Sequence, residues 1–169
     1  MTSLVPKIDS STKTDDFALH DGGDTIHCND LRWLPLAPKV WIKLVKLSPE
    51  TGSYTVIVRA EKGGVLPRHR HIESAEIYVI RGDGKHPQTG HFAKGDYVSE
   101  RKGAVHDPLV FEDEVEMLMM SNGPSAFIDD EGRELFLMDV SMLQHLADST
   151  SEEFGTQPGR VGKRASGMC

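Results

Sequence analysis

Three histidines have the residue type and spacing of a metal site. His69 and His71 are two residues apart in an extended segment, so their side chains point to the same face of a strand. Imidazole nitrogen binds iron, zinc, copper and nickel. Glu76 follows on the next strand, where it could bind the metal or form a hydrogen bond to a ligand. A third histidine, His106, lies further along the chain.

The first histidine pair lies in a pattern that resembles the first signature motif of the cupin superfamily, G-x5-H-x-H-x3,4-E-x6-G. The chain matches this motif from Gly63 through Glu76, and its closing glycine, Gly82, falls one position early. Two motifs in the right order are far more specific than an isolated H-x-H pair.

The third histidine lies in a pattern that resembles the second cupin motif, G-x5-P-x-G-x2-H-x3-N. Gly95, Gly103 and His106 match with the motif's spacing, whereas Arg101 replaces the proline and Val110 replaces the asparagine. The glycines permit the tight turns that bring the two motifs together. The pair of motifs implies a small all-β barrel that holds one divalent metal.

Residues 31–146 further resemble the cupins that are similar to 2,4'-dihydroxyacetophenone dioxygenase, and through them the acetylacetone-cleaving dioxygenases. The segments that carry the resemblance are 31–36, 66–71, 103–107 and 122–132. The resemblance implies a mononuclear non-haem iron(II), held by His69, His71 and His106, although zinc or nickel also suits three imidazoles. It implies a role beside the metal or in gating for Glu100.

The reaction implied by this resemblance is oxidative cleavage of a carbon–carbon bond. A diketone or hydroxyketone would bind through two nearby oxygens, and both atoms of dioxygen would enter the products. The metal lowers the pKa of the enol and orients the reactants. Three neutral imidazoles leave a charge of +2, which favours an anionic enolate. Arg101 departs from the family pattern directly after Glu100, which leaves the shape of the pocket and the substrate open.

Two other functions fit the same metal set. A lyase or isomerase needs a base near the α-proton of its substrate, for which Glu76, Glu100 or Tyr78 could serve. If Glu76 faces inward, Tyr78 shares its face of the strand, either as a substrate contact or as a core residue. A metal-binding regulatory cupin, like those of some anti-sigma factors, usually carries an additional helical domain.

The hydrophobic pattern predicts the elements that position these residues. Strands are predicted at 40–45, 54–60, 65–71, 75–81, 89–93, 97–100, 104–111, 115–121, 125–128 and 134–138, and a helix at 140–147. Gly82 to Gly84 reads as a turn. Short strands with one terminal helix indicate a single jelly-roll barrel. We expect a flexible arm at 1–26, the cupin domain at 27–148 and a disordered tail at 149–169.

Composition limits the partners and the compartment. The 169 residues carry a formal net charge of −7, which argues against a nucleic-acid partner. No apolar run approaches the roughly 20 residues of a membrane span, and no signal peptide is visible, so we expect a cytoplasmic protein. Cupins often pair through outer strands, so we expect a homodimer or a tetramer. The remaining histidines are expected to be solvated and not to bind metal: His20, His27, His86, His91 and His145.

Overall fold

The computed structural model describes residues 25–153, which form fourteen strands, one 3-10 helix and one α-helix. The elements in chain order are η1 (Cys28–Asp30), β1 (Leu34–Ala37), β2 (Val40–Ser48), β3 (Ser53–Ala60), β4 (Val65–Leu66), β5 (His69–His71), β6 (Ala75–Arg81), β7 (Asp83–His86), β8 (Gly90–Ala93), β9 (Tyr97–Glu100), β10 (Val105–His106), β11 (Leu109–Val110), β12 (Val115–Ser121), β13 (Ser125–Ile128), β14 (Glu134–Met138) and α1 (Val140–Glu153).

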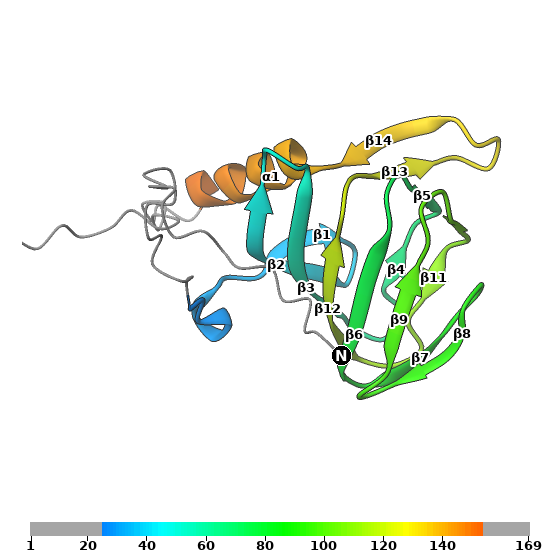
Figure 1. The fold of residues 1–169 in the computed structure, drawn as a ribbon. Helices are drawn as coiled ribbons and strands as arrows, with labels where there is room; N and C mark the ends of the chain where they lie inside the picture. The colour runs from blue at the N-terminus through cyan, green and yellow to red at the C-terminus, as the bar shows by residue number, and fades with distance from the viewer. Residues whose placement is uncertain (1–24, 154–169) are drawn as a thin grey trace, which may run out of the picture.

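A six-stranded sheet, in the order β1-β2-β3-β12-β6-β9, forms one wall of the molecule (Figure 1). Its strands form because apolar residues alternate with polar ones, which suits a sheet with one buried face. On β3, Tyr54, Val56, Val58 and Ala60 are all nearly inaccessible to solvent. All neighbouring strands in this sheet are antiparallel.

Smaller sheets complete the fold. One has four strands in the order β10-β5-β13-β14, and the other two are the pairs β11-β4 and β7-β8. The smaller sheets matter for function because β5 and β10 pair directly, with His106 opposite His69. The strands that carry the two sequence motifs are therefore neighbours.

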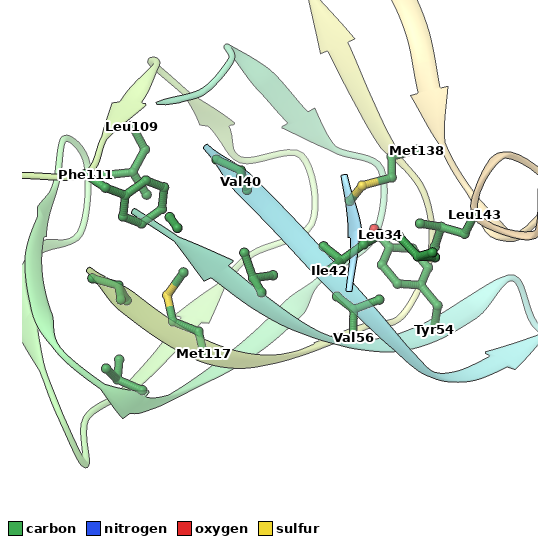
Figure 2. Close-up of a cluster of buried hydrophobic side chains, with 14 of the residues drawn as sticks. Leu34, Val40, Ile42, Tyr54, Val56, Leu109, Phe111, Met117, Met138 and Leu143 are labelled. Carbon is green, nitrogen blue, oxygen red and sulfur yellow. The ribbon is translucent and has the colours of Figure 1, made fainter. Parts of the chain in front are cut away.

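The hydrophobic core lies against the inner face of the large sheet (Figure 2). Leu34, Ile42 and Val56 lie near Tyr54 and the Leu143 side chain of α1, as Figure 2 shows. Leu143 is fully buried, so α1 is anchored at this end of the core. The helix contacts β1, β2 and β14, and in Figure 1 it continues directly from β14. The core thereby gives the strands of the site a fixed support.

The predicted all-β fold with a C-terminal helix is confirmed, with several differences in its elements. The predicted strands at 65–71 and 104–111 each divide into two short strands, β4 with β5 and β10 with β11. Strands β1 and β7 were not predicted, and β7 begins inside the expected turn at Gly82–Gly84. The helix extends to Glu153, beyond the predicted end at residue 147. Most of the predicted arm and tail lies outside the described residues. Within residues 25–153, no helix has the length and apolarity needed to cross a membrane.

Candidate metal centre

Three imidazoles converge at one point beside the core. His69 and His71 project from the same face of β5, while Arg70 between them is exposed, as predicted. His106 projects from β10 beside them. The three ring centroids are 5.1 Å apart in every pair, and one nitrogen from each ring lies within 4.8 Å of the others. The structure thus brings together the three histidines that the sequence selects.

The His69 ring is oriented by a carbonyl group of its own chain. Its Nδ1 lies 2.9 Å from the carbonyl oxygen of Pro67. A carbonyl oxygen only accepts hydrogen bonds, so Nδ1 carries the proton and Nε2 keeps its lone pair. An imidazole held in this way is ready to bind a metal through Nε2.

The donor set fits a divalent metal ion. Nδ1 and Nε2 of His106 are both buried and have no hydrogen-bond partner among the described residues. Nε2 of His71 is likewise buried, and a carboxylate oxygen of Glu100 lies 2.8 Å from it. Unsatisfied buried polar atoms are costly. A metal ion at the convergence point would satisfy the ligand nitrogens.

Burial favours the neutral form of His69 and of His106. It lowers the pKa of His69, and it lowers the pKa of His106 to about 4, against the attraction of the Glu100 carboxylate. Only a neutral imidazole can donate its lone pair to a metal. At neutral pH both rings are therefore in the form that binds.

Glu100 lies directly beside the histidine cluster. Its side chain is buried at the end of β9, with Oε2 2.8 Å from His71 Nε2 and Oε1 3.5 Å from His106 Nε2. Burial alone would raise its pKa, but the hydrogen bond with His71 and the attraction of His71, His106 and His86 in their charged forms outweigh burial and lower the pKa. Glu100 is therefore a carboxylate at neutral pH, at the spacing of neighbouring ligands around one ion.

The structure does not bring Glu76 or Tyr78 to this cluster. On β6, Ala75 is opposite Glu100, so it is Ala75 that faces inward and Glu76 that faces outward. The Glu76 carboxylate instead accepts a hydrogen bond from the hydroxyl of Tyr97, and Tyr78 is 46% exposed on the same outer face. The inward orientation considered for Glu76 and Tyr78 is wrong, because β5 and β6 belong to different sheets and side-chain parity does not carry over between them.

His86 is a member of the site that the sequence analysis missed. It was expected to be solvated, yet only 5% of it is exposed, and its ring lies 4.5 Å from that of His106. Its Nε2 lies 3.6 Å from Oε1 of Glu100. Alternation along a strand would have placed His86 on the same face as Gly84. That signal was overlooked because the glycines at 82 and 84 suggested a turn and not a strand. His27, His91 and His145 are exposed, as predicted, and His20 lies outside the described residues.

A small apolar cavity of about 60 Å³ adjoins the cluster. By the same measure a water molecule needs roughly 10–15 Å³, so the cavity suits a ligand of only a few non-hydrogen atoms. Its walls come from both layers of the fold and are mostly aliphatic, aromatic or thioether side chains, among them Ile77, Val98, Phe92, Met117, Met119 and Phe127. The polar residues in its lining are His69, His71, His86, Thr89, Glu100 and Ser125.

Known proteins resemble this chain in sequence and in fold. The acetylacetone-cleaving enzyme of Acinetobacter johnsonii is 32% identical over 96 residues, which is 54% of this chain and 63% of that enzyme. The match therefore spans less than two thirds of the relative's length. The crystal structure of an acetylacetone dioxygenase from Acinetobacter johnsonii aligns with a TM-score of 0.69 at 23% identity, over 75% of this chain and 92% of that chain.

An RmlC-like cupin from Ralstonia eutropha aligns with a TM-score of 0.72 at 20% identity, over 80% of this chain and 90% of that chain. At such identities these two structures establish the cupin fold. The family model of the ChrR cupin-like domain matches residues 21–126, more than half of the chain and all three converging histidines. The chain therefore belongs to the family of ChrR cupin-like domains.

Proposed function

We propose that this protein is a mononuclear non-haem iron(II) dioxygenase that cleaves a carbon–carbon bond of a small diketone or hydroxyketone. The observation that carries the proposal is the convergence of three imidazoles on one point at the wall of a small apolar cavity. The sequence similarity to an acetylacetone-cleaving enzyme supports it.

His69, His71 and His106 would hold the iron, with the Glu100 carboxylate beside them. When bound, iron(II) supplies a Lewis acid for an enolisable substrate and the redox capacity needed to react with dioxygen. Three neutral ligands leave the positive charge of the ion available to an enolate. The carbonyl of Pro67 and the hydroxyl of Ser125, 3.4 Å from His71 Nδ1, orient the ligand rings.

The protein contributes a base and a dry cavity. Glu100 is ionised at neutral pH, so Oε1 or Oε2 can accept the proton that leaves the α-carbon when the substrate enolises. The apolar lining excludes water, which strengthens the attraction between the enolate and the positive site. The cavity volume favours small aliphatic diketones over larger aromatic hydroxyketones.

A non-oxidative metal-dependent lyase or isomerase is the second candidate. The position of Glu100 favours it, since a base next to a Lewis acid suffices for proton abstraction without any oxidant. Oxygen consumption distinguishes the two candidates, because only a dioxygenase uses one dioxygen for each substrate molecule cleaved.

The test is oxygen uptake by metal-free protein that has been reloaded anaerobically with iron(II). Uptake is followed with an electrode against β-diketones and α-hydroxyketones, including acetylacetone and 2,4'-dihydroxyacetophenone. His106→Ala removes one ligand, whereas His91→Ala changes an exposed histidine of the β7–β8 hairpin and serves as the matched control. Uptake equal to substrate cleaved, lost in the first variant and kept in the second, supports the proposal.

Absence of uptake with every compound, in protein that holds one iron per chain, would reject the dioxygenase. Conversion of substrate without uptake would identify the lyase or isomerase. Metal binding without any conversion would favour a regulatory role for the cupin.

We also propose that the protein is a homodimer or a larger homo-oligomer. The outer face of the six-stranded sheet exposes the side chains of Tyr78, Ile80, Tyr97 and Met120. Exposed apolar side chains grouped on one sheet face are typical of contacts between subunits. Light scattering coupled to gel filtration measures the molar mass, and a monomer at micromolar concentration would contradict this proposal.

A further inference from the structure

His86 occupies the inner end of the β7–β8 hairpin, next to the proposed metal ligands. It is the last residue of β7 and is paired with Gly90, the first residue of β8. Its side chain is buried and forms part of the cavity lining. It also belongs to a second group of potential ligands, with Glu100 and His106. Whether it binds metal or serves another purpose depends on which ring nitrogen carries its proton.

The backbone of the hairpin loop determines that tautomer. Nδ1 of His86 accepts hydrogen bonds from the backbone N–H groups of Gln88 and Thr89, both at 3.2 Å. A nitrogen that accepts two N–H groups carries no proton, so the proton of the neutral ring is on Nε2. His69 has the opposite tautomer, because its Nδ1 donates to a carbonyl. His86 therefore presents an N–H group to the site, where His69 presents a lone pair.

The loop that fixes this tautomer is itself attached to the metal site. The side-chain amide of Gln88 donates to the Asp107 carboxylate at 2.8 Å and accepts from the Asp107 backbone N–H at 3.3 Å. Asp107 directly follows His106, so the two hydrogen bonds hold the hairpin loop against the segment that carries a ligand. The position of the His86 ring relative to His106 is therefore fixed both by the loop backbone and by the Gln88–Asp107 hydrogen bonds.

The Nε2–H group of His86 faces Glu100. Three imidazoles surround this carboxylate, with nitrogen-to-oxygen distances of 2.8 Å for His71, 3.5 Å for His106 and 3.6 Å for His86. When His71 and His106 use Nε2 for a metal, neither can donate a hydrogen bond from that atom. Among these three rings, only His86 then retains a proton directed at Glu100.

We propose that His86 is a positioning residue: its Nε2–H group, 3.6 Å from Oε1 of Glu100, attracts that carboxylate and holds it beside the metal. This inference rests on the metal centre of the proposed function, and it does not depend on the oxidative reaction. The second ligand group, His86 with Glu100 and His106, is accordingly not a second metal site.

The first test measures the affinity of the protein for Co(II) alone, by titration of the visible absorption bands of the bound ion. His86→Phe keeps a flat ring and removes the donor, and we expect affinity to fall about tenfold, as is usual when a partner of a ligand is lost. His86→Gln places an N–H group near the position of Nε2 and should restore most of that affinity. His91→Phe, on the exposed part of the same hairpin, should match the wild type.

A double-mutant cycle identifies Glu100 as the group through which His86 acts. In the Glu100→Gln background, His86→Phe should weaken Co(II) binding far less than it does in the wild type, since the carboxylate it positions is gone. Equal losses in both backgrounds would overturn the proposal, as would a loss from His86→Phe as large as that from His69→Ala. Wild-type affinity in His86→Phe would also overturn it.

A second measurement uses the wild-type protein and does not depend on the folding of any variant. Long-range proton–nitrogen NMR spectra of the Zn(II)-loaded protein report which nitrogen of each histidine carries the proton. We expect His86 to be protonated on Nε2 and His69 on Nδ1. A His86 ring that is protonated on Nδ1 or bound to zinc through Nε2 would reject the proposal. Oxygen uptake is measured separately. If the dioxygenase reaction fails, the metal-affinity and NMR results still test the role of His86.

Discussion

The two nitrogens of a histidine ring have different uses, and this site separates them by backbone hydrogen bonds. A carbonyl oxygen beside Nδ1 prepares His69 to bind a metal, whereas two N–H groups beside Nδ1 of His86 prepare that ring to donate. Residue type alone does not distinguish the two roles. The sequence motifs identified His69 because its spacing is characteristic, and no motif includes His86.

The two candidate carboxylates provide a direct prediction at this scale. Glu100→Gln should weaken metal affinity about 10- to 100-fold, because the charge beside the ligand nitrogens is lost. Glu76→Gln should change it by less than about twofold, since the Glu76 side chain lies on the outer face of the sheet. Competition with a chromophoric chelator measures both affinities. A larger loss for Glu76→Gln than for Glu100→Gln would contradict the orientation of β6.

Protonation of His106 should destabilise the metal-free protein. Its pKa is about 4 when folded and near 6.5 when unfolded, so between these values the unfolded chain binds more protons. The free energy of unfolding should therefore fall as the pH decreases from 6.5 towards 4, by about 3 kcal/mol in total for this group. Above pH 6.5 the neutral His106 ring leaves the free energy of unfolding at its full value.

Urea denaturation in the presence of a chelator, from pH 7.5 to pH 4.5, measures this loss. His69, whose pKa is also lowered, contributes in the same direction, and Glu100 adds a loss at lower pH. The comparison is therefore made with His106→Gln, which should show a shallower decline. Identical slopes for the two proteins would exclude the burial effect on His106.

At the scale of elements, strands with clear alternation could be predicted, whereas a strand that starts among glycines could not. Residues 54–60 and 115–121 alternate regularly and were placed to within a residue. Strand β7 was missed because Gly82 and Gly84 usually mark a turn, although here they let the chain cross from the large sheet to a hairpin. The sequence could not show which residues of β6 face the metal, because this depends on the sheet that the strand joins.

Gly82 gives a prediction for the crossing into the hairpin. It has a φ of +83°, and an added Cβ would lie 2.2 Å from the backbone oxygen of Glu114. Gly82→Ala should lower the free energy of unfolding by about 3 kcal/mol, the sum of backbone strain and a close contact. Gly90→Ala, at φ +95° with no atom within 4 Å of the added Cβ, should cost only about 1 kcal/mol.

Urea denaturation of both variants separates the two contributions. Equal losses would show that the close approach to Glu114 is unimportant. A large loss for Gly82→Ala together with weaker metal binding would show that the crossing also supports the position of His86.

For the whole molecule, metal binding should stabilise the fold, because the site forms only when β5 and β10 are paired. At a free metal concentration about a hundredfold above the dissociation constant, the gain is about 2.7 kcal/mol, which raises Tm by about 10 °C in a domain of this size. Differential scanning calorimetry with and without a chelator measures it. His69→Ala should show almost no metal-dependent change, and His91→Ala should behave as the wild type. The same rise in His69→Ala would place the metal elsewhere.

The pairing of β5 with β10 has one more consequence. The ligands precede and follow the segment 72–105, which contains β6, β7, β8 and β9, so a bound ion would close that segment into a loop in the manner of a covalent cross-link. Closing a loop removes conformational entropy from the opened chain. Amide hydrogen exchange in β6 and β9 should therefore slow on metal loading more than exchange in β2, which lies outside the loop. A bound metal ion would then also be a reversible cross-link within this part of the fold.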